Sequence, residues 1–369
     1  MANKSEYYPG LNIYRALAVL LMMMAHSARI QTDMGALYNQ PSLAQFWDWP
    51  VLSTLLIEPI ISAMFLFIAG FSLVLSQQKQ KNSNSTWLWR LGNRMLTLYA
   101  ISVIFYVADR GFQLPDLLIS SGVLGVIALG LFTAGAALCT KRATPTLLAM
   151  TFATLGLALI LEQSNSNVVG LNAGAGGMIP LISLAYLGSL CGLAWLRWRN
   201  NGLLILLAVA SILSIFALQE PAPWITYPTS KIVIYGGDRV MAVFNSILDL
   251  FGLYHGVKQE AEVRYWNHSW IFVVRCLPLL LLGLLISLNS LKTIKQPILI
   301  FANWMGTQAL NFYVLHLLLL AAVEVLGAHT HHGWQTLFLV CAVLATSAWL
   351  LRYISIVPLG WVGNTKTAK

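Results

Sequence analysis

Residues 51–76 read VLSTLLIEPIISAMFLFIAGFSLVLS, an apolar run in which Glu58 is the one charged residue. The hydrocarbon core of a bilayer is about 30 Å thick, and a helix needs roughly 20 mostly apolar residues to cross it. The run is long enough to cross, and it lacks the two-residue alternation of strands in transmembrane barrels. This stretch therefore predicts a membrane-spanning helix.

The rest of the chain has the same character. Of its 369 residues, 58% are hydrophobic and only 9% are charged, whereas soluble domains carry about 25% charged residues. We therefore expect an all-α integral membrane protein, with its helices bundled in one domain. The ten predicted spans are residues 11–28, 51–76, 88–107, 117–138, 145–163, 178–196, 202–218, 269–290, 298–326 and 334–357.

Basic residues mark the sides of the membrane. The net charge is +9, but lysines and arginines beside spans indicate cytoplasmic connections rather than nucleic-acid binding. Their placement predicts a multi-pass protein of the inner (plasma) membrane with both termini cytoplasmic and no nucleic-acid partner. A signal peptide is an alternative for the N-terminus, because Lys4 precedes an apolar run that Ala25-His26-Ser27 follows. Arg15 inside that run opposes it.

Residues 219–268 are predicted to form one long extracytoplasmic segment. Within it, residues 240–256 read VMAVFNSILDLFGLYHG, which is short for a span and interrupted by polar residues. We expect a re-entrant or interfacial helix there, although a crossing would give eleven spans instead of ten. The polar residues of this segment are candidate acceptor-binding residues: Asp238, Arg239, Asp249 and His255.

The sequence predicts no metal site. Its four cysteines lie in or beside apolar runs without metal-ligand spacing, and they are expected to act as small buried hydrophobes. The histidines at 329, 331 and 332 have no suitably spaced cysteine or carboxylate beside them.

Arg15 and His26 are the notable pair of the first predicted helix. At 100° per residue, eleven residues return to within about 20° of one helix face and rise roughly 16 Å. Ionisable groups inside a membrane usually face a cavity or a bundle interior, so the shared face favours a functional site. The alternative is that Arg15 extends to cytoplasmic lipid phosphates and His26 marks the outer end of the helix.

Three other charged residues are candidates. Glu58 is expected at a depth similar to His26, where it would orient or charge-compensate the imidazole. Its alternative is a neutral carboxylic acid hydrogen-bonded between helices. Arg90 and Arg94 open the third span and suit phosphate recognition, although topology alone also explains them.

His316 lies in the middle of a late span, near Asn311 and Tyr313. We expect it to be a packed polar residue that bridges helices rather than a second base.

The first helix resembles that of the acyltransferase family 3 proteins, in which an Arg or Lys, ten residues and a His follow one another. Residues 65–71, FLFIAGF, look like that family's second-helix run, and residues 310–316, LNFYVLH, look like its late histidine segment. Arg90 and Arg94 depart from it, being four apart where the family often has two arginines three apart. The related heparan-glucosaminide acetyltransferase group shares the general plan.

The resemblance implies an acyl-CoA-dependent transferase. It would move an acyl group, most commonly acetyl, from cytoplasmic acyl-CoA to a hydroxyl of an extracytoplasmic or lipid-linked carbohydrate. His26 would be the general base or an acyl relay, and Arg15, with Arg90 and Arg94, would hold the donor. A thioester is already activated, so no metal is required.

Two other classes are compatible with the sequence. Buried Arg15, Glu58 and His26 also suit a transporter or flippase, which would move its substrate without covalent change. A polysaccharide polymerase or ligase would also have about ten spans and a long outer loop, but no dependence on acyl-CoA.

Overall fold

The computed structural model describes residues 9–31, 49–80, 83–110, 116–119, 121–164, 168, 171, 178–217, 270–290, 296–325 and 333–354. The predicted outer segment with its four candidate residues lies outside these ranges. Glu58 lies within a described helix, but its side chain is outside what the structure describes.

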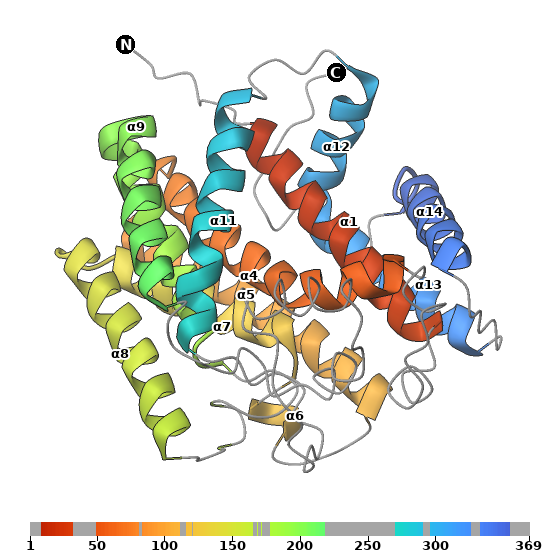
Figure 1. Ribbon diagram of the computed structural model, residues 1–369, viewed down its shortest axis with the longest axis horizontal. Helices are drawn as coiled ribbons and strands as arrows, with labels where there is room; N and C mark the ends of the chain where they lie inside the picture. The colour runs from red at the N-terminus through yellow and green to blue at the C-terminus, as the bar shows by residue number, and fades with distance from the viewer. Residues whose placement is uncertain are drawn as a thin grey trace. The chain divides into compact units, whose positions relative to one another are not determined.

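The regular secondary structure of the described residues is helical (Figure 1). The helices are α1 (Pro9–Gln31), α4 (Trp49–Gln78), α5 (Asn84–Arg110), α6 (Asp116–Ile119), α7 (Val123–Leu138), α8 (Ala143–Gln163), α9 (Ile182–Ala217), α11 (Trp270–Ser290), α12 (Pro297–Thr307), α13 (Ala309–Val325) and α14 (Gly333–Leu350).

Several of these helices are long and apolar enough to cross a membrane. Within the described parts of the chain they are Ile60–Gln78, Ala143–Gln163, Ser183–Ala217 and Trp270–Asn289, and α12 with α13 qualifies as one bent pair. The fold therefore fits a multi-pass helical membrane protein. α1 is less apolar because it carries Asn12, Arg15 and His26, and the expectation of ten spans stays a prediction.

The predicted span 117–138 is interrupted at Gly122. This residue has φ +113°, a left-handed conformation that glycine adopts readily, and it separates the short α6 from α7. Ser102 on α5 fixes the interruption, because its hydroxyl donates to the Ser121 carbonyl (2.7 Å) and accepts from the Gly125 amide (3.1 Å). Hydropathy cannot reveal this break, because the helices on both sides of Gly122 are apolar.

The predicted spans 178–196 and 202–218 form the two legs of α9, which meet at Arg199. That residue has φ +52°, and Gly202 beyond it packs against the Ala194 backbone carbonyl. Eight residues of straight helix would separate these two positions by about 12 Å, so the chain reverses sharply here. The two predicted crossings therefore correspond to two helical legs.

The predicted span 298–326 is also not straight, because α12 and α13 meet at 85°. The Gln308 amide turns back to the Trp304 and Met305 carbonyls (3.2 and 3.0 Å), and the Thr307 hydroxyl donates to the same Trp304 carbonyl (2.6 Å). These hydrogen bonds satisfy the end of α12 and allow the chain to change direction.

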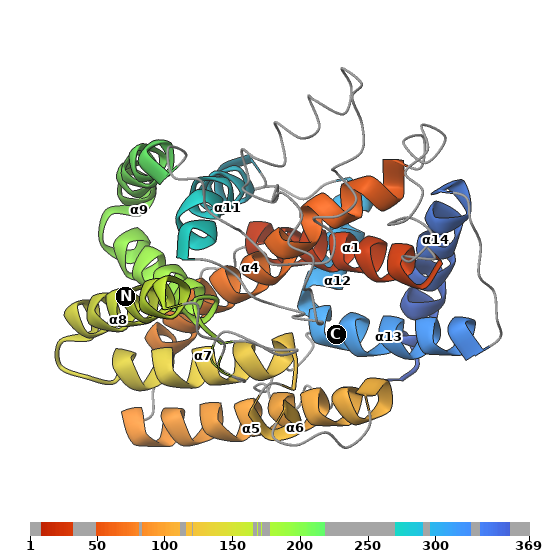
Figure 2. The same ribbon diagram turned by 60° about the horizontal axis from the view of Figure 1, so that its bottom comes forward.

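The chain divides into two compact units, one formed by residues 1–6 with 62–285 and the other by residues 7–61 with 286–369. In the first unit α7 packs against α5, α8 and α9 (Figure 2). In the second, α1 packs against α12, α13 and α14 (Figures 1 and 2). The expectation of a single membrane domain stays a prediction.

Small residues let α4 and α9 approach closely in the first unit. Gly70 packs against the Ala185 carbonyl, and Gly188 packs reciprocally against the Phe67 carbonyl. The Ser189 hydroxyl also donates to the Gly70 carbonyl (3.1 Å). Such close backbone contact is how membrane helices associate without a hydrophobic driving force between them. It explains the glycine of the 65–71 motif as a packing requirement.

Candidate functional site

The polar residues of α1 gather against the bent helix pair of the second unit. Near the start of α1, the Asn12 amide donates to the Asn303 side-chain oxygen on α12 (3.0 Å). Arg15 donates through Nη1 to the Asn12 side-chain oxygen (2.8 Å). Arg15 therefore belongs to a hydrogen-bonded group that joins α1 to α12. The first turn of α1 contains no acidic residue.

Gly306 makes this junction possible. It lies against the Asn12 backbone, so close that a β-carbon at position 306 would overlap the Asn12 carbonyl. The α12 backbone can reach α1 at this point only because residue 306 has no side chain.

At the other end of α1, His26 meets a second histidine on α13. Its Nδ1 lies 2.9 Å from Nε2 of His316, and the two ring planes differ by 12°. The opposite nitrogen of His316, Nδ1, lies 3.0 Å from the Phe312 carbonyl, and the Tyr313 ring packs edge-on against His316 (80°). His316 is completely buried, whereas His26 is partly exposed.

The bend at Gln308 gives the two ends of α1 different neighbours. The Arg15 end contacts α12, and the His26 end contacts α13. The two predicted residues thus lie on one helix, roughly 16 Å apart along its axis. His26 contacts His316 of α13 directly, whereas Arg15 is joined to α12 through Asn12. Sequence reasoning placed His316 as a bridge between helices but did not connect it to His26.

Arg90 and Arg94 lie near the start of α5 in the first unit. Arg90 is exposed and Arg94 is partly buried. At the same end of the unit, Gln77 of α4 donates to the Leu138 carbonyl at the end of α7 (3.0 Å), with Lys141 and Arg142 following in the chain. The two arginines therefore lie at an end of this unit that is rich in positive charge.

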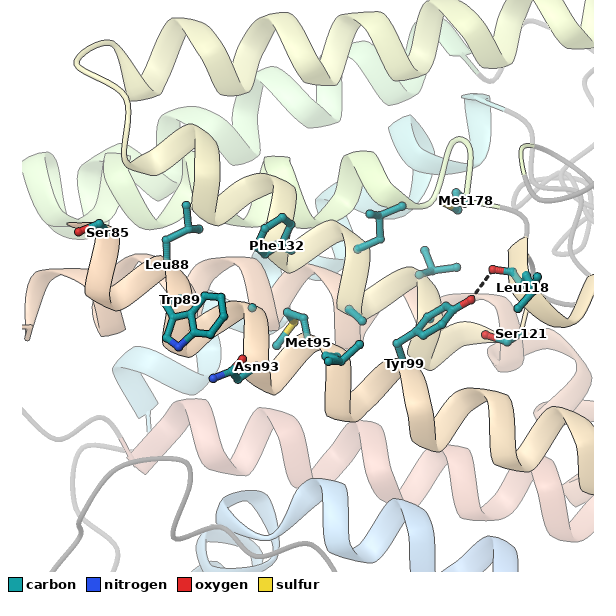
Figure 3. Close-up of a pocket in the computed structure, with 17 residues that line it drawn as sticks. Ser85, Leu88, Trp89, Asn93, Met95, Tyr99, Leu118, Ser121, Phe132 and Met178 are labelled. Atoms are coloured by element: carbon teal, nitrogen blue, oxygen red, sulfur yellow. Dashed lines mark hydrogen bonds between the residues drawn. The ribbon is translucent and has the colours of Figure 1, made fainter. Parts of the chain in front are cut away.

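The first unit also contains an apolar cavity of about 780 Å³. It extends along α5 and α7, from Ser85 and Trp89 at one end to Tyr99 and Met178 at the other (Figure 3). At the second end the Tyr99 hydroxyl donates to the Leu118 carbonyl. Among the described residues, its lining includes no charged side chain, so the cavity offers space for an apolar group.

Metal-ligating side chains do not cluster in the described residues, where no three His, Cys, Asp or Glu side chains come together. Several described side chains could take part in chemistry, among them the imidazoles of His26 and His316 and the guanidinium groups of Arg15, Arg90 and Arg94.

A comparison with protein families finds a match over the first part of the chain. Residues 8–187 match the family described as heparan-alpha-glucosaminide N-acetyltransferase, catalytic. No curated protein matches the chain significantly. The matched range includes α1 with Arg15 and His26 and the start of α5 with Arg90 and Arg94. The match supports a transmembrane acetyltransferase-like protein, but it does not support acyltransferase family 3 specifically.

Proposed function

We propose that the protein transfers an acetyl group from cytoplasmic acetyl-CoA to a carbohydrate or glycolipid acceptor at the outer side of the membrane, with His26 as the general base. The observation that carries the proposal is the hydrogen bond between His26, on a helix within the acetyltransferase match, and His316 on α13. A neutral imidazole can accept a proton through its unprotonated ring nitrogen.

The reaction needs one proton acceptor. The acceptor hydroxyl oxygen attacks the thioester carbonyl carbon, so that a carbon–oxygen bond forms and the carbon–sulfur bond breaks. His26 takes the hydroxyl proton as the oxygen attacks, and the departing CoA thiolate then receives a proton. Attack by His26 itself, to form an acyl-imidazole that the acceptor then displaces, is the two-step alternative.

The matched family's name describes transfer to the nitrogen of a glucosaminide. Amino sugars are therefore tested beside sugars that offer only hydroxyl groups. Glu58 remains a proposed partner of the imidazole. The proposed acceptor contacts remain Asp238, Arg239, Asp249 and His255. We also propose that the protein lies in the inner membrane with both termini cytoplasmic.

The test of this function is a labelled-donor assay. Purified protein in lipid nanodiscs is incubated with radiolabelled acetyl-CoA and with glucosamine, neutral sugars or lipid-linked sugars, and we expect label in the acceptor. Label retained on the protein when no acceptor is present would favour the two-step route. Sugar movement across proteoliposomes without acetylation would instead identify a transporter, and chain extension without acetyl-CoA would identify a polymerase.

Arg90 and Arg94 are proposed to hold the donor phosphates. We expect the double variant Arg90→Gln/Arg94→Gln to raise the KM for acetyl-CoA about tenfold or more, because charge-assisted hydrogen bonds contribute about 1.5–3 kcal/mol each. The kcat should change much less, since the phosphates lie far from the reacting carbonyl. Initial rates at varied acetyl-CoA concentration measure both constants.

The matched control for this pair is Arg142→Gln, which removes an exposed cation that we expect to mark topology only. Its KM should stay near the wild-type value. An equal rise in KM for control and double variant would show that general positive charge, not these two side chains, attracts the donor.

A further inference from the structure

The hydrogen bonds of the histidine pair determine which nitrogens carry protons. A backbone carbonyl can only accept, so Nδ1 of His316 must be the donor in its 3.0 Å contact with Phe312. In a neutral ring the other nitrogen, Nε2, then has a lone pair and no proton. His26 must therefore donate through Nδ1 in the 2.9 Å contact between the two rings.

This assignment leaves Nε2 of His26 as the basic nitrogen of the pair. We propose that His316 is a positioning residue that holds His26 in the Nδ1–H tautomer and so directs the lone pair on Nε2 toward the acceptor. The inference rests on the proposed function for its catalytic meaning, but the tautomer itself is a property of the resting protein.

Burial keeps the roles of the two rings distinct. His316 is completely buried, whereas His26 is partly exposed, and charging a buried ring is unfavourable unless other groups compensate. A proton taken up from the acceptor therefore stays on His26. The imidazolium then donates through Nδ1 to the neutral His316 ring, and this hydrogen bond becomes stronger because its donor is charged.

The helices hold His316 in this orientation. Phe312 lies one turn before His316 on α13, so the carbonyl that fixes the buried ring belongs to the same helix. The bend at Gln308 directs α13 along the His26 end of α1, while α12 contacts the Arg15 end. His316 thus acts on His26 as a fixed acceptor rather than as a mobile side chain.

The direct test is nitrogen NMR of the resting protein. With ¹⁵N-labelled histidine in nanodiscs, the signals of His26 are assigned by their loss in His26→Gln, and protonated and unprotonated ring nitrogens are well separated. We expect wild-type His26 to carry its proton on Nδ1, and His316→Leu to give a mixture of both tautomers. A proton on Nε2 in the wild type, or an unchanged tautomer in His316→Leu, would overturn the proposal.

Steady-state kinetics of the His316 variants test whether the tautomer of His26 affects the rate of acetyl transfer. We expect His316→Leu to lower kcat about 10- to 100-fold, the effect of losing one hydrogen bond to a charged group, with less than about a twofold change in the KM for acetyl-CoA. His316→Gln, whose amide oxygen can accept the same hydrogen bond, should recover most of the rate. Equal losses in both variants, with the His26 tautomer unchanged, would make His316 a packing residue only.

The NMR result does not depend on the proposed function. If wild-type protein transfers no acetyl group while His26 still shows the Nδ1–H tautomer, the enzyme assignment fails and the pairing stands. If transfer occurs and His26 carries its proton on Nε2, the proposed pairing fails and the enzyme assignment stands.

Discussion

Replacing His26 with alanine is expected to lower acetyl transfer by about 10²- to 10⁴-fold, the usual contribution of a general base. The loss should appear in kcat, because without the imidazole the acceptor proton has no nearby destination when the hydroxyl attacks. It is measured as turnover of radiolabelled acetyl-CoA at saturating donor and acceptor. Residual turnover would reflect binding and orientation of the two substrates.

The control for this variant is Ser27→Ala, on the next residue of α1. The Ser27 hydroxyl is buried and forms no hydrogen bond with the residues that the structure describes, so its removal should leave both stability and turnover nearly unchanged. Full transfer by a folded His26→Ala protein would exclude His26 as the base. An equal loss in Ser27→Ala would instead attribute the effect to disturbance of α1.

The sequence was sufficient to predict the class of fold. Hydropathy and charge placement require only local counts, and the helices α4, α8 and α11 lie within a few residues of the predicted ranges. The positions where the chain changes direction were not predictable in this way. Both legs of α9 and both arms of the α12–α13 pair are apolar, and hydropathy measures how long a run is, not whether it is straight.

Backbone conformation, not hydropathy, sets those changes of direction. At Arg199 a left-handed residue reverses α9 beside Gly202, and at Gln308 the end of α12 closes on itself through Thr307 and Trp304. Gly202 is visible in the sequence, but its packing against the Ala194 carbonyl, eight positions earlier, is not.

The candidate site was predictable on one helix only. Helical periodicity places Arg15 and His26 on one face of α1 because both belong to one regular element. The partner of His26 is 290 positions away in the chain, and no periodicity connects residues on different helices. His316 could be recognised as a polar residue in an apolar run, but its pairing needs the bend between α12 and α13.

Gly306→Ala is expected to destabilise the protein by about 1–3 kcal/mol, the usual effect of adding a methyl group where there is no space for it. The new β-carbon would overlap the Asn12 carbonyl, and because that atom belongs to the backbone, α12 must move away from α1. This displacement lengthens the Asn12–Asn303 hydrogen bond and removes a support of Arg15. Heating detergent-solubilised protein and following its monodisperse fraction measures the loss as a lower Tm.

Gly156→Ala is the matched control, since it adds the same methyl group on α8. Apart from its chain neighbours and the nearby backbone of α8, no atom of the described residues lies within 4 Å of the new β-carbon. Alanine also favours a helix over glycine by roughly 1 kcal/mol, so this variant should keep or slightly raise the Tm. Acetyl transfer should fall in Gly306→Ala even below its Tm, because the same bent pair positions both ends of α1. An unchanged Tm in Gly306→Ala would show that α1 and α12 do not meet as closely as the structure places them, and the Arg15 end of the proposed site would then lose its support.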